Sequence, residues 1–135
     1  MTTIPPNKER FRSVFLVVTA MGLTPIALLY GIAPEKTLPW LFGIDVSGVD
    51  TRHIFKAFMG LYIALVAFWI AGALRPKLRL PALWSLFIFM VGLAGGRILS
   101  LLIDGQPSGL LMFYLGLEII FGAVAWWLLL DESAS

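Results

Sequence analysis

Two charged residues, Arg97 and Glu118, lie in stretches of the sequence that are otherwise uncharged. A charged side chain in the hydrocarbon of a bilayer costs a few kcal/mol at least, and such side chains face the protein interior or a water-filled cavity. Residues 104–107 form a tight turn, so the two flanking segments are expected to be antiparallel helices. At about 1.5 Å per residue, Arg97 and Glu118 then differ in depth by about one helical turn. The spacing predicts that the arginine side chain can reach the glutamate.

Four further polar residues are expected in the same half of the molecule. Asp104 lies two turns after Arg97 on one helix face, and Tyr114 lies one turn before Glu118. Two more polar residues begin the second predicted helix at the same end. The sequence therefore predicts a polar cluster of six residues, which are His53, Lys56, Arg97, Asp104, Tyr114 and Glu118.

Two interpretations of this cluster stay open at the level of sequence. In the first, Arg97 pairs with Glu118 or Asp104 and fixes the register of the helices, while Lys56 extends its side chain outward. In the second, the cluster borders a cavity open to the outer leaflet, where it binds a polar or anionic ligand or handles a proton.

The elements that must position these residues follow from composition. Of the 135 residues, 59% are hydrophobic and 13% are charged, about half of the charge that is usual in a soluble domain. Four uncharged or nearly uncharged stretches are long enough to cross the hydrocarbon core. We therefore predict an all-α membrane protein, one domain over residues 1–135, with four transmembrane helices in an antiparallel bundle at about 11–32, 54–74, 81–103 and 108–130. This composition excludes a soluble enzyme and a nucleic-acid-binding protein.

Proline and glycine refine this picture. Pro25 lies inside the first predicted helix, where it predicts a kink. The segment from Pro39 to Ile44 is apolar but too short to span, and a proline start with a glycine stop predicts a short interfacial helix. Small residues at helical spacing predict where helices approach closely. These are Gly60, Ala64, Ala67, Ala71, Gly92, Gly96 and Gly122, of which Gly92 and Gly96 alternatively form the seam of a dimer.

Basic residues predict the orientation of the chain. The side with both termini and the loop between the second and third helices holds six Lys or Arg residues, against three on the other side. The excess predicts both termini in the cytoplasm. Because the basic residues lie where helices leave the membrane, the expected partners are membrane lipids rather than nucleic acid, with a homo-oligomer or a larger membrane complex as further possibilities.

Other chemistry is sparse in this sequence. His53 is the only histidine and there is no cysteine, which excludes a multi-histidine metal site and thiolate chemistry within one chain. No serine, histidine and aspartate stand at a recognisable catalytic spacing, and no glycine-rich phosphate loop is present. We predict no catalytic residue, no metal and no cofactor.

Several segments resemble a bacterial family of small four-helix membrane proteins described only as a domain of unknown function. The similarity lies in Leu41-Phe42-Gly43, in His53 with Lys56 to Tyr62, in Gly96 to Leu101, in Asp104 to Ser108, and in Leu117-Glu118. The resemblance implies a four-helix fold in the inner membrane. It implies no activity.

Three functional hypotheses follow. The first is a non-enzymatic binding or accessory module whose site is the polar cluster. The second is a small oligomeric transporter or channel that uses Glu118 and Arg97. The third is a membrane enzyme that acts on lipid through His53, Glu118 and Arg97, and we rank it last.

Overall fold

The computed structural model describes residues 4–133, which form five α-helices and no strand. The helices are α1 (Pro6–Gly31), α2 (Pro34–Phe42), α3 (Val49–Leu74), α4 (Pro76–Ile103) and α5 (Gly109–Ser133). Residues 1–3 and 134–135 of the predicted domain lie outside the described residues. Four of the helices are long and apolar enough to cross a membrane, as the sequence predicts.

Three of the long helices begin about five residues earlier than predicted. The prediction counted apolar residues, whereas α1, α3 and α4 each begin in a polar segment that precedes the apolar one. Pro6 and Pro76 lie in the first turns of α1 and α4, where the missing N–H of proline breaks no helical hydrogen bond. The helices therefore extend past the apolar stretches at these ends.

The short helix α2 follows directly on α1. It begins at Pro34, so Pro39, the predicted start, lies inside it. It ends at Phe42 and is followed by Gly43, whose φ of 65° is in the left-handed region that favours glycine. The hydroxyl of Thr37 donates to the carbonyl of Leu29, which joins α2 to the last turn of α1.

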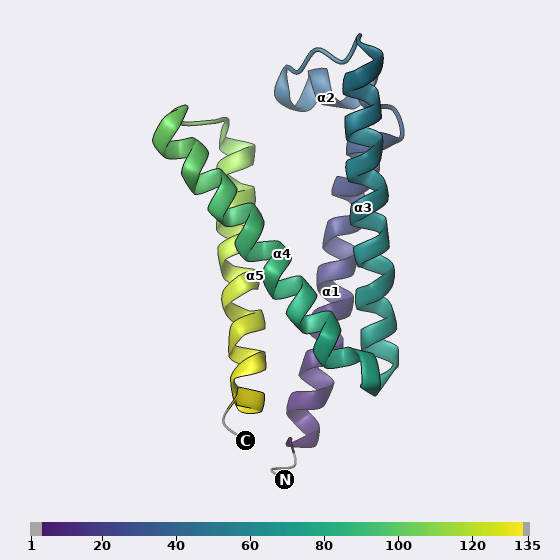
Figure 1. Cartoon of the computed structure of the whole chain (residues 1–135), viewed down its shortest axis with the longest axis vertical. Helices are drawn as coiled ribbons and strands as arrows, with labels where there is room; N and C mark the ends of the chain where they lie inside the picture. The colour runs from purple at the N-terminus through teal and green to yellow at the C-terminus, as the bar shows by residue number, and fades with distance from the viewer. Residues whose placement is uncertain (1–3, 134–135) are drawn as a thin grey trace.

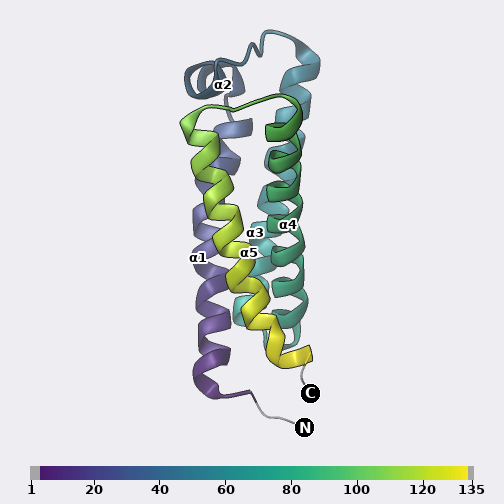
Figure 2. The ribbon, with the colours of Figure 1, turned by 90° about the vertical axis from the view of Figure 1, so that its left-hand side faces the viewer.

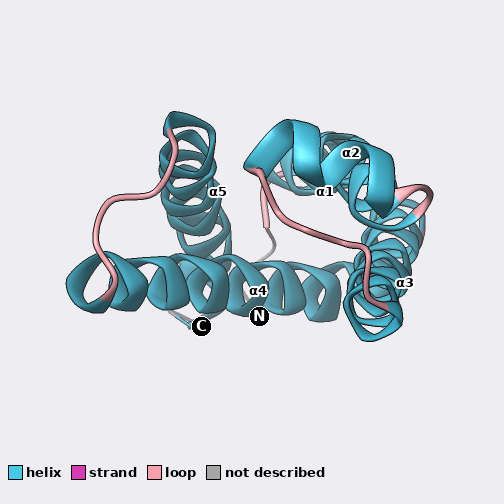
Figure 3. Cartoon of the chain, turned by 90° about the horizontal axis from the view of Figure 1, so that it is seen from above, coloured by secondary structure: helices cyan, strands magenta, loops and turns pink. Residues whose placement is uncertain are grey.

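Successive long helices alternate in direction (Figure 1). Both termini and the α3–α4 connection lie at one end of the molecule, here called the termini end. The helix α2 and the α4–α5 connection lie at the opposite end, here called the α2 end (Figure 2). Viewed from above, α4 is strongly tilted and diverges from α3 toward the α2 end (Figure 3). The molecule thus consists of two helix pairs, α1 with α3 and α4 with α5, which separate toward the α2 end.

The best-buried core lies toward the termini end. Leu16, Trp69 and Leu86 are fully buried there, and the Trp69 indole N–H donates to the Ser85 hydroxyl at 3.0 Å. A Cβ added at Gly72 would overlap the Cβ of Ala82. Glycine is therefore required at this position for α3 and α4 to approach closely near their connection.

Most of the small residues predicted to pack helices together do not do so within the chain. Gly60, Ala64 and Ala67 are exposed on α3, and Ala71 is half-buried. Gly92 and Gly96 are exposed on α4, with open space where a Cβ would be. Only Gly122 is buried, against Met90. The buried face of α3 instead carries the larger residues Tyr62, Val66 and Trp69, followed by Gly72 and Ala73 near the termini end. Side-chain size alone does not mark the contact face of a helix in lipid.

Candidate functional site

Arg97 on α4 and Glu118 on α5 form an ion pair. The Nε atom of Arg97 donates to both carboxylate oxygens of Glu118, each at 2.9 Å. The Arg97 guanidinium also lies over the ring of Tyr114, with its carbon 5.9 Å from the ring centroid. The arginine side chain is 24% exposed, whereas the glutamate side chain is 9% exposed. The cation is thus the more accessible member of the pair.

The pair lies in the wall of an open cavity of about 120 Å³ between α1, α3, α4 and α5. The chain has three tyrosines, and all of them line this cavity together with Arg97 and Glu118. The rest of the wall is largely apolar and includes Leu23, Ile26, Met90, Leu93 and Phe121. A mostly apolar lining with a few polar groups is typical of small-molecule sites, although this cavity is smaller than most of them.

Aromatic contacts close the cavity toward the termini end. The ring of Phe15 on α1 stacks on the ring of Phe121 on α5, with centroids 5.6 Å apart. Beyond it, Phe11 contacts Trp127 at 5.8 Å. Among the described residues, the ring contacts and side-chain hydrogen bonds between α1 and α5 all lie at or beyond this stack. On the other side of the stack both helices line the cavity without such contacts.

Tyr30 forms the boundary of the cavity at the α2 end. Its ring contacts Phe42 on α2 and both Phe55 and Tyr62 on α3, with centroids between 5.9 and 6.3 Å apart. A second, aromatic pocket adjoins it under α2 and shares Tyr30 and Tyr62 with the first. The residue also interacts electrostatically with Arg97. Tyr30 therefore connects α2 to the ion pair.

Of the six residues of the predicted cluster, three lie together. Arg97, Tyr114 and Glu118 line the cavity. Asp104 is exposed and accepts a hydrogen bond from the Ser100 hydroxyl at 2.7 Å, not from Arg97. His53 and Lys56 are exposed on α3 and do not line the cavity.

Sequence reasoning missed Tyr30 and Tyr62. Both lie inside apolar stretches, where a tyrosine does not stand out as a charge does. The signal that was present is their depth, since Tyr30 and Tyr114 lie in the halves of their helices nearer the α2 end and Tyr62 lies at the middle of α3. A phenol at this depth needs a hydrogen-bond partner.

Outside the spans, Asp45 accepts a hydrogen bond from the N–H of Ser47 at 2.9 Å. This hydrogen bond holds the pKa of Asp45 below its usual value, because it stabilises the charged form. The Asp45 carboxylate is fully exposed, in the segment between α2 and α3. It is not among the residues that line the cavity.

Comparison with known proteins gives one match. A family model described as a domain of unknown function (DUF4345) covers residues 11–129. The chain belongs to this family. The match agrees with the resemblance noted from the sequence, and the DUF4345 description names no activity. No curated protein and no solved structure is significantly similar to the chain.

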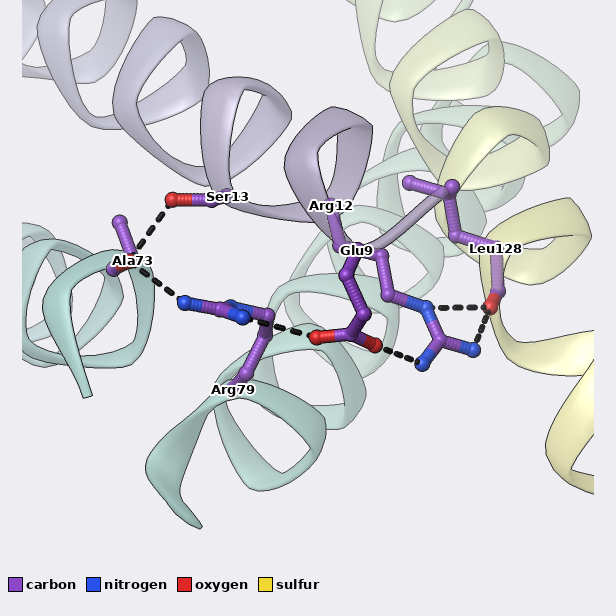
Figure 4. A network of polar contacts seen from close by, with 6 residues as sticks. All are labelled: Glu9, Arg12, Ser13, Ala73, Arg79 and Leu128. Atoms are coloured by element: carbon purple, nitrogen blue, oxygen red, sulfur yellow. Dashed lines mark hydrogen bonds and ion pairs between the residues drawn. The ribbon is translucent and has the colours of Figure 1, made fainter. Parts of the chain in front are cut away.

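The DUF4345 chain holds a second polar network at the termini end, which the sequence did not reveal (Figure 4). Glu9 on α1 accepts hydrogen bonds from Arg12 at 2.8 Å and from Arg79 on α4 at 2.7 Å. Arg12 also donates twice to the carbonyl of Leu128 on α5, at 2.6 and 3.1 Å. Arg79 and Ser13 both donate to the carbonyl of Ala73 at the end of α3. The network therefore joins all four long helices.

Burial sets these arginines apart from ordinary basic residues at a membrane surface. The Arg12 side chain is 2% exposed and that of Arg79 is 13% exposed. Among residues 4–133, the Arg79 Nε is buried without a hydrogen-bond partner. In the sequence, both residues indicate only the orientation of the chain. In the structure they hold the two helix pairs together at the termini end.

Proposed function

We propose that the chain crosses a bacterial inner membrane four times as one antiparallel bundle, with both termini in the cytoplasm. The four long apolar helices support the spans. The termini end carries six of the nine Lys and Arg residues counted for orientation, which supports a cytoplasmic placement of that end. In this proposal α1 bends at Pro25, which lies in its interior.

The same proposal places α2 at the outer surface of the bilayer. Its Leu38 is buried against the protein, whereas Trp40 is 80% exposed. Tryptophan is enriched at membrane interfaces, where its ring lies at the level of the headgroups. One buried and one exposed apolar side suit a helix that covers the bundle while lying flat in the interface.

We further propose that the protein is a non-enzymatic binding module, with the cavity beside Arg97 and Glu118 as its ligand site. One observation carries this proposal, namely that an ion pair and all three tyrosines of the chain line one open, largely apolar cavity. A pair that served only to fix helix register would be expected in a sealed interface. Here the arginine stays partly accessible, so a ligand can reach it.

The other two hypotheses receive less support from the geometry. A pathway through one chain would have to pass the Phe15–Phe121 stack and the Glu9 network, which close the termini end of the cavity. Transport would thus require a second copy. Lipid chemistry by three residues would require His53 beside Arg97 and Glu118, and His53 is exposed outside the cavity.

Mass spectrometry of the protein in mild detergent tests the binding function. Gly22 lines the cavity with open space where a Cβ would be, so Gly22→Leu places a side chain in the cavity without touching the ion pair. Gly60→Leu is the matched control, because Gly60 also faces open space but does not line the cavity. We expect the wild type and Gly60→Leu to retain a small molecule and Gly22→Leu to retain at least tenfold less.

The proposal fails if the wild type retains no small molecule, or if Gly22→Leu retains as much as the control. The same spectra report the oligomeric state. A stable oligomer that retains no ligand would favour the transporter hypothesis instead.

A further inference from the structure

We propose that the ligand is a single-chain membrane amphiphile with an anionic oxygen head group, a carboxylate or a phosphate. Its head lies at Arg97, its chain runs toward Phe121, and it enters from the bilayer between α1 and α5. This inference rests on the proposed binding function and adds the class of ligand, its orientation and its route.

The cavity has a polar side and an apolar side, in the order that an amphiphile requires. The polar groups, Tyr30, Tyr62, Arg97, Tyr114 and Glu118, lie toward the α2 end. Along α1, the cavity wall runs from Tyr30 to Thr19, about 16 Å at 1.5 Å per residue. Its lower part is bounded by Leu23, Met90 and Phe121. A lipid in the leaflet on the α2 side has its head and chain in this same order.

Several hydrogen-bond donors line the polar side of the cavity. The Arg97 guanidinium carries five N–H bonds, and the one on Nε is shared between the two oxygens of Glu118. Neither Nη1 nor Nη2 donates to that carboxylate within the described chain. Each of the three phenols can donate one hydrogen bond and can also accept one. A head group that supplies acceptors complements this set, and anionic oxygens form the strongest hydrogen bonds with a guanidinium.

The sign of the accessible charge favours an anionic head over a cationic one. Arg97 and Glu118 cancel in formal charge, but the arginine side chain is 24% exposed and the glutamate side chain 9%. A head group in the cavity therefore meets the cation first. A cationic head would be placed against the guanidinium and would be repelled.

The route of access follows from where α1 and α5 touch. Their ring contacts and side-chain hydrogen bonds in the described chain lie at or below the Phe15–Phe121 stack, and above it both helices line the cavity. Gly22 lies on the part of α1 that lines the cavity, and no atom of a neighbouring element lies within 4 Å of where its Cβ would be. The opening thus faces the bilayer rather than water. The cavity volume of about 120 Å³ is small, which favours a single-chain ligand over a two-chain phospholipid.

Photocrosslinking of the purified full chain in mild detergent tests the class and the orientation together. The probe is a palmitic acid with a diazirine near the end of its chain. We expect crosslinks in residues 19–23 of α1 and around Phe121 of α5. Unlabelled competitors of equal chain length separate the head groups. The carboxylate and the alkyl phosphate should compete best, the alcohol should compete at least tenfold less well, and the amine should compete least. Whichever of the carboxylate and the phosphate competes better identifies the source of the anionic oxygen.

A neutral variant tests whether Arg97 recognises the head. The double variant Arg97→Gln with Glu118→Gln removes both charges without leaving one unpaired. We expect competition by the acid to fall at least tenfold while competition by the alcohol stays the same. Lys56→Gln is the matched control, because it removes a charge at the same end of the molecule but outside the cavity.

Two results would overturn the inference, namely an amine that competes as well as the acid, or crosslinks that cluster at α2. Should Gly22→Leu abolish labelling while all head groups compete equally, the cavity binds ligands and only the head-group assignment is wrong. Labelling that Gly22→Leu leaves unchanged would contradict the binding function itself.

Discussion

The Nε atom of Arg97 lies 2.9 Å from each of the two carboxylate oxygens of Glu118. One donor thus holds both acceptors, and the pair joins α4 to α5 within the largely apolar interior. Taking two charges from water is costly, and removing one partner leaves the other charge uncompensated. This asymmetry makes the pair testable through stability alone.

We expect Glu118→Gln to destabilise the protein by about 3 kcal/mol, because Arg97 then stays desolvated without a carboxylate. The double variant Arg97→Gln with Glu118→Gln should be more stable than this single variant, since it leaves no unpaired charge. Thermal unfolding in mild detergent measures both. A single variant as stable as the double variant would mean that the Arg97 charge is well solvated.

Two glycines of α3 should respond oppositely to alanine. At Gly72 a Cβ would overlap that of Ala82 and lie 3.1 Å from the Leu78 carbonyl oxygen, so Gly72→Ala should cost about 1–3 kcal/mol. At Gly60 nothing lies within 4 Å, so Gly60→Ala should gain about 0.5–1 kcal/mol from reduced backbone entropy in the unfolded state. Denaturant titrations in mixed micelles compare them. A loss at Gly60 would indicate that another chain contacts this face.

The Glu9 network should stabilise the termini end. Glu9→Gln removes the carboxylate that Arg12 and Arg79 share, and we expect a loss of about 1.5–3 kcal/mol, the range for hydrogen bonds to charged groups. Glu35→Gln on α2 is the control, because Glu35 is exposed. Hydrogen exchange should locate the loss in the ends of α1 and α4. Equal protection in the two variants would argue against the network as a joint between the helices.

The proposed orientation predicts the behaviour of reporter fusions. Alkaline phosphatase folds only outside the cytoplasm, so a fusion after residue 135 should be inactive and an insertion in the α4–α5 connection should be active. Fluorescent protein fused at the same two positions should give the converse pattern. An active phosphatase at the C-terminus would reverse the orientation.

The four spans could be predicted from sequence because a bilayer imposes one requirement, a long apolar stretch, on every crossing helix. The partners Arg97 and Glu118 could be anticipated because a tight turn fixes their relative depth. A longer segment separates α1 from α4, and although α3 and α4 are joined by a single residue, the strong tilt of α4 carries its far end away from α3. The positions of Tyr30 and Tyr62 next to Arg97 were therefore not predictable.

Helix contacts were predicted less well than helix existence. Small residues allow close approach but do not require it, and the Gly60 stripe of α3 faces outward in the chain. Basic residues were similarly ambiguous. Arg12 and Arg75 look alike in sequence, yet the structure buries the first and exposes the second. Burial of Arg12 depends on the neighbours that accept its hydrogen bonds, which are the Glu9 carboxylate and the Leu128 carbonyl. Of these two, Leu128 is distant from Arg12 in sequence.

The Glu9 network joins the long helices at the termini end, so α4 can change its tilt about this joint. The helix α4 is 28 residues long, so a change in its tilt of about 5° about that joint moves its far end by roughly 4 Å. Tilt is also how a helix adjusts to the thickness of its membrane. In the proposed membrane placement, the width available beside Arg97 would therefore change with the tilt of α4, and so with the thickness of the surrounding lipid.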